Sequence, residues 1–501
     1  MVKDSGLLER LKEYGKSDYY PFHMPGHKRQ IGGMFAREFP NPFSIDITEI
    51  DGFDNLHHPE GILRESMEWA ARVYGADRTY YLVNGSSCGI LSAICGTTNN
   101  SDTILMSRNS HKSAYHGVFL NHLQAMYIYP HLLTNTCVQG GLLPDEIEDM
   151  LKTNVEISTV FVVSPTYDGI VSDIKTIANI CHNYKIPLIV DEAHGAHFRY
   201  GKDLPVSALE LGADVVIQSV HKTLPSLTQT ALLHVKEGYV DVEKIERYLH
   251  IYQSSSPSYV LMAGIENCIR YMEGSGKQAE QTERMQAELS GRERMEMLLE
   301  KVKKLRAELS QMKNLSILGP EVIGEAGVYD LDLTKLIILT GGTDLTGARL
   351  ERILRERYHL EMEMCTDNYV TAILSVMDTD EGIGRLRDAL LEIDGELCGQ
   401  KSTEGRLDTA AFLPDIRMTI YEAVNKEKET VALADSAGRI SGEYVYIYPP
   451  GIPIAAPGEV LKQEIIDTVL RYREMGLAVQ GLKDESLRTI DVIEERKPWE
   501  K

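Results

Sequence analysis

The chain has 501 residues, of which 43% are hydrophobic, and it carries 52 Lys and Arg against 74 Asp and Glu. A chain of this length exceeds one core of ordinary size, so we expect two or three domains. The formal charge of -22 argues against a general nucleic-acid-binding surface or a surface for anionic membranes. A cationic small-molecule substrate is compatible with that charge.

The seven cysteines are scattered, without a CxxC pair or any metal-ligand spacing. This usage predicts a reduced, cytoplasmic protein with no metal site rather than a disulfide scaffold. Residues 1–15 mix charges with leucines at helical spacing, and they predict an amphipathic helix rather than a signal peptide. The longest hydrophobic runs have the length of strands, far short of a membrane span.

Strand and helix patterns alternate from about residue 70 to residue 240, in the manner of βαβ units. This alternation predicts an α/β domain with a parallel sheet. Helix-compatible stretches such as Ile174–Tyr184 separate the strands. The expected strands are Thr79–Val83, Thr103–Met106, Ala125–Tyr129, Thr159–Val163, Pro187–Val190, Val215–Ile217 and Thr230–Val235.

The second half of the chain begins with a long charged segment whose apolar residues share one helical stripe, which predicts a helix linking two domains. A coiled coil is the alternative, but about four heptads without clear charge pairing favour packing against the body. The charged helix Leu345–Tyr358 and short strands around it predict a smaller α+β domain, and the polar run Gly399–Asp408 predicts a linker. The stripe contains Met285, Leu289, Met295, Leu298, Leu299, Val302, Leu305, Leu309 and Met312. The expected divisions are an N-terminal segment 1–60, a large domain 61–300, a small domain 301–398 and a C-terminal domain 409–501.

Two residues at strand ends suggest pyridoxal phosphate. Lys222 follows the apolar strand at Ala213–Ile217, and Asp191 ends the strand before it. A pyridoxal enzyme needs a lysine amine to hold the cofactor aldehyde as a Schiff base, and a carboxylate to keep the pyridine nitrogen protonated. Parallel α/β sheets bind their ligands at the carboxyl ends of the strands, where both residues are expected.

A phosphate site and two ring contacts are expected around this pair. The segment Asn84–Gly89, with Gly85, Ser86 and Ser87, follows a strand and opens an apolar helix, so its amides and hydroxyls can hold a phosphate. A plain Gly/Ser turn with a Ser cap is an equal alternative on these residues alone. Candidates for the other contacts are Ser219 for the phosphate, His111 stacked on the ring, and His194 on Asp191 or the cofactor hydroxyl, with His197 structural.

Several motifs, in this order, resemble the pyridoxal-phosphate-dependent ornithine/lysine/arginine decarboxylases of bacteria. The resemblance covers nearly the whole chain and implies fold type I, the fold of aspartate aminotransferase, with a mainly parallel sheet. Two departures are the loop Thr223–Ser226, which contains a proline, and the short stretch before Pro21, which has no room for the wing domain of the larger members. The motifs are Pro21–Lys28, Asn109–Ser113, Ser164–Gly169, the Asp191 and Lys222 segments, Tyr448–Pro453 and Pro457–Glu459.

The resemblance implies decarboxylation of arginine, lysine or ornithine to an amine and carbon dioxide, as a step toward polyamines. The phosphate would be held by Ser86, Ser87 and Ser219. His111 would stack on the pyridine ring, Asp191 would pair with the ring nitrogen, and Lys222 would carry the cofactor. A homodimer, or an assembly of dimers with sites built by both chains, is implied as well. An aminotransferase or another pyridoxal-dependent lyase is the alternative, and a regulatory binding protein that keeps the fold is a third.

The proton returned to the substrate and the recognition of its distal cation need further groups. Lys222 or His221 is placed to deliver the proton. Glu459, after the proline-rich loop that the resemblance brings to the active site, is the first candidate for the distal cation, and Asp367 is the second. A solvated glutamate that caps the following helix Val460–Tyr472 is the competing interpretation of Glu459.

Overall fold

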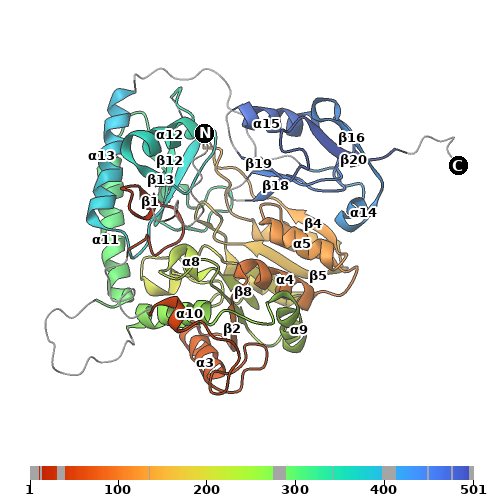
Figure 1. Ribbon diagram of the computed structural model, residues 1–501. Helices are drawn as coiled ribbons and strands as arrows, with labels where there is room; N and C mark the ends of the chain where they lie inside the picture. The colour runs from red at the N-terminus through yellow and green to blue at the C-terminus, as the bar shows by residue number, and fades with distance from the viewer. Residues whose placement is uncertain are drawn as a thin grey trace.

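The structure is a computed structural model that describes residues 11, 14–30, 40–134, 136–274, 289–341, 343–397, 413–447, 451–474 and 478–495. Most of the predicted N-terminal helix and the whole predicted linker Gly399–Asp408 lie outside these residues. Figure 1 shows three parts: a large sheet flanked by helices, a smaller sheet with two long helices at its side, and the C-terminal part, drawn in blue.

The large sheet has seven strands in the order β2-β9-β8-β7-β5-β3-β4. The neighbouring strands from β8 to β4 are parallel, which confirms the predicted fold class. All seven strands lie close to the predicted ranges. They are β2 (Arg78–Leu82), β3 (Thr103–Ser107), β4 (Gln124–Ile128), β5 (Ile157–Val163), β7 (Leu188–Asp191), β8 (Val215–Gln218) and β9 (Ala231–Val235).

One strand runs against the others in this sheet, which is therefore mainly parallel, as the resemblance implied. β9 runs antiparallel to both of its neighbours, β8 and β2. Its connection from β8 carries only the four-residue helix α8 (Val220–Thr223). A parallel crossover usually passes through a full α-helix, which this connection lacks, and the chain turns back beside β8 instead.

The strands of the large sheet are buried on both faces, as parallel sheets require. Successive residues of β7 alternate between the two sides: Leu188 and Val190 belong to one hydrophobic cluster and Ile189 belongs to the other. The helices that supply these clusters lie on opposite sides of the sheet. They are α4 (Gly85–Thr97), α5 (Lys112–Leu120) and α9 (Val242–Tyr252) on one side, and α3 (Ile62–Tyr74), α6 (Pro144–Thr153), α7 (Ile174–Asn183) and α10 (Tyr259–Glu273) on the other.

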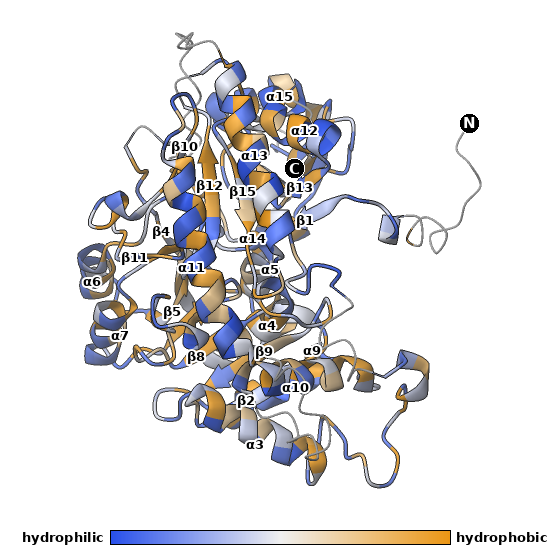
Figure 2. Cartoon of the chain, turned by 90° about the vertical axis from the view of Figure 1, so that its left-hand side faces the viewer, coloured by the Kyte–Doolittle hydropathy of each residue, from blue (hydrophilic) through white to orange (hydrophobic). Residues whose placement is uncertain are grey.

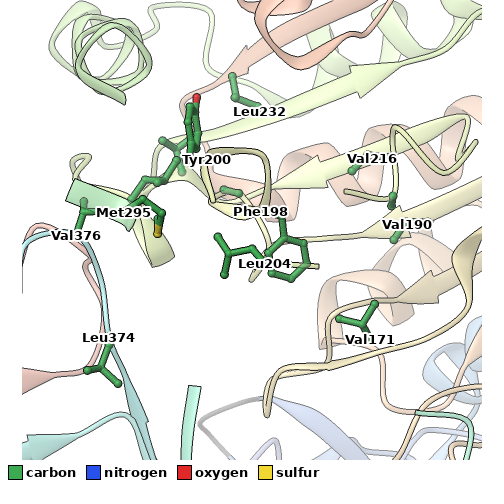
Figure 3. Packing of buried hydrophobic residues seen from close by; sticks show 14 of the residues in the cluster. Val171, Val190, Phe198, Tyr200, Leu204, Val216, Leu232, Met295, Leu374 and Val376 are labelled. Carbon is green, nitrogen blue, oxygen red and sulfur yellow. The ribbon is translucent and has the colours of Figure 1, made fainter. Parts of the chain in front are cut away.

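The predicted linking helix is α11 (Gly291–Leu309), which begins with a capping box formed by Ser290 and Glu293. The described residues of its apolar stripe from Met295 to Leu309 are buried in the same cluster as the large domain, so the helix packs against the body as predicted. Figure 3 shows Met295 of this helix beside Tyr200, in the same cluster as strand residues such as Val216. The expected domain division at residue 300 falls inside this helix.

The small domain has a four-stranded antiparallel sheet in the order β10-β12-β15-β14. Figure 2 shows α11 and α13 in front of this sheet, with hydrophilic and hydrophobic residues alternating along both helices. The N-terminal strand β1 pairs with β13, which ties the start of the chain to this domain. The elements are β1 (Tyr20–Phe22), β10 (Ser316–Ile317), β12 (Lys335–Leu339), α12 (Gly347–Tyr358), β13 (Leu360–Met362), β14 (Met364–Cys365), β15 (Tyr369–Ile373) and α13 (Asp380–Glu396).

The C-terminal part has a separate hydrophobic cluster that includes Leu433, Val469 and Val492. Two small sheets build it, one of strands β16 and β20 and one in the order β18-β17-β19. Its elements are α14 (Ile420–Asn425), β16 (Lys428–Ala432), β17 (Val445–Ile447), β18 (Ile452–Ala455), α15 (Gln463–Glu474), β19 (Val479–Gln480) and β20 (Thr489–Ile493). A further short pair joins β6 (Ile170–Val171) to β11 (Asp330–Leu331).

Candidate active site

A cavity of about 570 Å³ lies at the carboxyl ends of the parallel strands, where α/β sheets bind their ligands. All three parts of the chain contribute to its wall. The large domain supplies residues at or after the ends of β2, β3, β5, β7 and β8, and the small domain supplies residues 363, 364 and 366–369. The C-terminal part supplies Ile447, residues 452–454 and Tyr472. Segments far apart in the sequence therefore meet at one site.

Lys222 and Asp191 both line this cavity, as the sequence predicted. Asp191 is at the end of β7, and Lys222 lies in α8, just after the neighbouring strand β8. Asp191 is 4% exposed and accepts a hydrogen bond from the amide of Ala193 at 3.1 Å. Burial raises the pKa of the Asp191 carboxyl, and the charge of Lys222 opposes that shift. Burial likewise lowers the pKa of the Lys222 amine, while Asp191 raises it. The two groups are thus close enough for the protonation state of one to change the pKa of the other.

The predicted phosphate cradle forms the first turn of α4. Gly85, Ser86 and Ser87 line the cavity, and the preceding residue Asn84 makes no side-chain cap, so the first amides of the helix are available to an anion. Gly85 has a φ of +75°, a conformation that residues with a side chain rarely adopt. Ser219 is fully buried and does not line the cavity, and its Oγ has no hydrogen-bond partner among the described residues.

His111 lies in the cavity wall at the start of α5, where the sequence predicted a ring-stacking residue. Its Nδ1 lies 2.7 Å from the hydroxyl of Ser113 and accepts from the Ser113 amide at 3.2 Å, which holds the ring in one orientation. Burial, with Lys222, Lys112 and His116 nearby, lowers its pKa to about 3. The imidazole is therefore neutral at physiological pH, as a ring that stacks on a cationic pyridine should be.

His221 also lines the cavity, but its ring is fixed in one tautomer. Its Nδ1 lies 2.8 Å from the carbonyl oxygen of Thr230, and because a carbonyl only accepts, Nδ1 carries the proton. Burial lowers the pKa of His221 to about 4. Its Nε2 is therefore unprotonated at neutral pH and has no proton to give, which leaves Lys222 as the better donor of the two predicted candidates.

His194 contacts two lysines in the structure, and its predicted bond to the cofactor hydroxyl stays a prediction. It lines the cavity, and its Nε2 lies 3.1 Å from Nζ of Lys222 rather than against the Asp191 carboxylate. Its Nδ1 lies 2.8 Å from Nζ of Lys335, a buried lysine at the start of β12. His197, predicted to be structural, does not line the cavity and pairs with Asp332 at 3.2 Å.

Three carboxyl groups besides Asp191 line the cavity and form its acidic wall: Asp168, Glu363 and Asp367. The Tyr369 hydroxyl donates to Asp168 at 2.9 Å, and burial raises the Asp168 pKa to about 6. Glu363 accepts hydrogen bonds from the Tyr167 hydroxyl and from the Met24 amide. Arg471 donates to Oδ2 of Asp367, whose Oδ1 is buried and has no partner among the described residues.

Glu459 does not line the cavity, unlike the second candidate Asp367. It is 2% exposed, and its Oε2 accepts from Arg108 at 3.1 Å and from the amide of Ala456 at 2.9 Å. The helix that Glu459 was alternatively expected to cap is α15, which starts only at Gln463. The geometry therefore favours a third role, in which Glu459 neutralises Arg108, a cationic residue of the cavity wall.

The Glu459→Gln variant is expected to lose stability, because it leaves the Arg108 guanidinium buried without a counter-charge. We expect the free energy of unfolding to fall by about 3 kcal/mol, measured by urea denaturation. The control is Glu237→Gln, which breaks the exposed pair with Arg78 at 2.9 Å and should cost less than about 1 kcal/mol. Unchanged stability together with a selective loss of activity on basic amino acids would instead restore the distal-cation role for Glu459.

The N-terminal motif reaches the site within a single chain. The amide of Gly26 donates to the carbonyl of His221 at 2.8 Å, and Met24 lines the cavity. A β-carbon on Gly26 would lie 2.6 Å from the Leu224 carbonyl oxygen, so only glycine permits this approach. The distance of this motif from Lys222 in the sequence therefore does not require a second chain to bring it there, and the dimeric state stays a prediction.

The sequence did not single out several residues that the structure places at or beside the site, among them Tyr167, Asp168, Glu363 and Lys335. Tyr167 and Asp168 stand in the motif Ser164–Gly169, but nothing local indicated their role. Lys335 begins an apolar strand and carried no signal at all. Only the packing of β12 against the large domain brings its amine to His194.

The described residues contain no cluster of His, Cys, Asp and Glu that could hold a metal ion. Within the same residues, no helix is both long and apolar enough to cross a membrane. The groups in the cavity fit pyridoxal phosphate instead. Lys222 offers the amine, Asp191 the buried carboxyl for the ring nitrogen, and the uncapped amides of α4 a phosphate site. Ser219, the third predicted phosphate contact, has a buried hydroxyl without a partner among the described residues but does not line the cavity, so its contact with the phosphate stays a prediction.

Comparison with known proteins places these features in a family. The model of the Orn/Lys/Arg decarboxylase major domain matches residues 5–381, and that of the Orn/Lys/Arg decarboxylase C-terminal domain matches residues 407–485. The arginine decarboxylase of Bacillus subtilis is 32% identical, over 99% of this chain and 99% of that protein. The constitutive lysine decarboxylase of Escherichia coli is 25% identical, over 96% of this chain and 79% of that protein.

Solved structures show the same fold. The structure of the E. coli constitutive lysine decarboxylase covers 97% of this chain and 81% of its own, with a TM-score of 0.74 and 20% identity. The ureidoglycine-glyoxylate aminotransferase of Bacillus subtilis covers 74% of this chain and 92% of its own, with a TM-score of 0.54 and 13% identity. Because both family models match and together span most of its length, the chain belongs to the Orn/Lys/Arg decarboxylase family.

Proposed function

We propose that the protein binds pyridoxal phosphate and decarboxylates a basic amino acid, arginine, lysine or ornithine, to the corresponding amine. The observation that carries this proposal is that one and the same cavity is lined by Lys222 and Asp191 and by the acidic wall of Asp168, Glu363 and Asp367. When bound, the cofactor supplies a ring that accepts the electrons released as carbon dioxide leaves.

Residues of the chain would bind the cofactor, orient it and return the proton to the substrate. Asp191, buried and at a strand end, would accept a hydrogen bond from the ring nitrogen and keep that nitrogen protonated. The neutral imidazole of His111 would lie against the ring, and the first turn of α4 would hold the phosphate. Lys222 returns the proton to Cα, because the Nε2 of His221 has none to give at neutral pH.

The distal cation of the substrate is assigned to Asp367 rather than to Glu459. Glu459 is already paired with Arg108, whereas Asp367 lines the cavity with one oxygen held by Arg471 and the other without a partner. A buried acceptor without a partner is costly, and a guanidinium or ammonium group of the substrate would satisfy it. Glu363 and Asp168 add negative charge to the same wall.

Aminotransferases share this fold, so the fold alone does not separate decarboxylation from transamination. The test is to supply purified protein and pyridoxal phosphate with arginine, lysine and ornithine separately. Carbon dioxide and the matching amine are the expected products. A keto acid with stoichiometric pyridoxamine phosphate would support the aminotransferase alternative, and no turnover of any amino acid would support a binding protein. An assembly of dimers, a cytoplasmic location and a place in polyamine formation stay predictions.

The Asp367→Asn variant should lose kcat/KM on the preferred basic amino acid by roughly 10- to 100-fold, because it removes a charge-assisted hydrogen bond worth about 1.5 to 3 kcal/mol. The cofactor absorbance should not change. Norleucine lacks the distal cation, so the variant and the parent should have the same kcat/KM on it. The ratio of kcat/KM for the cationic substrate to that for norleucine should therefore fall in the variant. An equal loss on both substrates would contradict the assignment. The control is Asp388→Asn, which alters an exposed carboxylate paired with Arg387.

A further inference from the structure

His194 joins two lysines that come from different domains: Lys222, which lines the cavity, and Lys335, which is buried. Its Nε2 lies 3.1 Å from Nζ of Lys222, and its Nδ1 lies 2.8 Å from Nζ of Lys335. Lys335 is 1% exposed and does not line the cavity, so it cannot reach a ligand there. Its amine also lies 5.7 Å from the centre of the Tyr167 ring. The function proposed above has no use for this second lysine.

The protons on this triad are limited by what each group can donate. A neutral imidazole has one N–H donor and one acceptor nitrogen, and an ammonium group can only donate. If both lysines were ammonium groups, both imidazole nitrogens would have to accept, which a neutral imidazole cannot do. Burial and the two neighbouring lysines hold the His194 pKa well below its usual value, so the ring is not an imidazolium. One lysine must therefore be a free amine that accepts the N–H of His194.

We propose that Lys335 is the ammonium group of this triad and that, through His194, it holds Lys222 as the free amine that attacks the cofactor aldehyde. Lys335 donates to Nδ1, so the imidazole proton sits on Nε2 and points at the lone pair of Lys222. Lys335 is thus a positioning residue that acts through His194. The inference rests on the proposed function, since it gives Lys222 the protonation state that cofactor attachment needs.

The surrounding charges favour this assignment over the reverse. Burial lowers the pKa of Lys335 to about 8, and nearby carboxylates oppose that shift, so Lys335 is still mostly protonated at pH 7. Lys335 faces three carboxyl groups, Asp332, Glu363 and Asp168, whereas Lys222 faces two, Asp191 and Glu363. Desolvation lowers the pKa of Lys222 too, and the repulsion between two neighbouring ammonium groups disfavours charging both. Each member of the triad faces further charged or titratable groups. Around Lys335 these are Asp332, Asp168 and Glu363, and around Lys222 they are Asp191, Glu363 and His111. Around His194 they are His221 and His197.

The first experiment measures the pH dependence of the Lys222 amine in the cofactor-free, full-length protein. Acetic anhydride labels free amines, and mass spectrometry reports the labelling rate of the Lys222 peptide against the exposed Lys175 as internal reference. Lys335→Met keeps the length of the side chain but removes the charge that opposes protonation of Lys222. The midpoint of the Lys222 profile should therefore move up by about one to two pH units. Lys335→Arg keeps the charge and should restore a midpoint close to that of the parent.

A midpoint that does not move in Lys335→Met would overturn the proposal, even if the variant is less stable, because a merely structural lysine lowers stability without shifting the profile. The second measurement needs no lysine variant, in case Lys335→Met does not fold. The ¹⁵N chemical shifts of histidine in the cofactor-free protein, with His194 assigned by its loss in His194→Gln, should show the proton on Nε2. A proton on Nδ1 would mean that Lys222 is the ammonium group and would contradict the assignment.

Both measurements use protein without cofactor or substrate. A failure of decarboxylation would therefore refute the proposed function and leave these results unaffected, whereas an unmoved midpoint or an Nδ1 proton would refute the triad and leave decarboxylation standing. The two hypotheses fail separately.

Discussion

The Lys222→Met variant is expected to lose turnover by at least about 10²- to 10⁴-fold, the contribution of the proton transfer alone. The loss should exceed that range, because the variant also lacks the amine that attaches the cofactor. In the parent protein, borohydride reduction should fix the cofactor on the peptide that contains Lys222. The variant should bind the cofactor only reversibly, through the phosphate site at α4, and dialysis should remove it.

The matched control is Lys112→Met, which removes another lysine near the site. Lys112 begins α5 next to His111, and its Nζ lies 3.3 Å from the hydroxyl of Tyr446 and 4.7 Å from the centre of that ring. This control protein should stay yellow from its bound cofactor, and borohydride should still fix the cofactor on the Lys222 peptide. A cofactor adduct on Lys112, or on no lysine of the parent protein, would refute the assignment of Lys222.

The second large effect is expected for Asp191→Ala. The carboxylate keeps the ring nitrogen protonated, and without it the ring accepts electrons poorly, so turnover should fall by roughly two to three orders of magnitude, as for the loss of other preorganised electrostatic groups. Cofactor binding should be partly retained, because Lys222 and the amides of α4 remain. Kinetics with the preferred amino acid and a titration of the cofactor absorbance separate these two effects.

A suitable control is Asp214→Asn, which changes a buried aspartate at the opposite end of the sheet. Asp214 immediately precedes β8, accepts from the Leu188 amide at 2.8 Å and pairs with His182 at 3.0 Å. It does not line the cavity. Its replacement should lower stability and leave the cofactor absorbance as in the parent. Near-normal turnover of Asp191→Ala would show that another acid protonates the ring, with Asp168 or Glu363 as the next candidates in the cavity wall.

The sequence was sufficient to predict the strands of the large sheet and the position of Lys222 and Asp191 beside each other. The seven strands and the linking helix follow from hydrophobic periodicity, which is a local property of the chain. The position of Lys222 and Asp191 at the ends of adjacent strands follows from the same periodicity, because parallel strands present their carboxyl ends at one edge. Even so, the alternation did not reveal the direction of β9, whose connection from β8 carries only a four-residue helix.

The contacts that tune the site were decided only by the tertiary structure. Lys335 is 141 residues from His194 in the chain, and Glu459 is 351 residues from Arg108, yet each pair meets within hydrogen-bond distance. No local pattern marks such partners, because a buried charge finds its counterpart through the packing of separate domains and not through spacing along one element. The sequence by itself thus determined which residues can carry the chemistry, and the tertiary structure decided which of them face the cavity and which protonation states their neighbours impose.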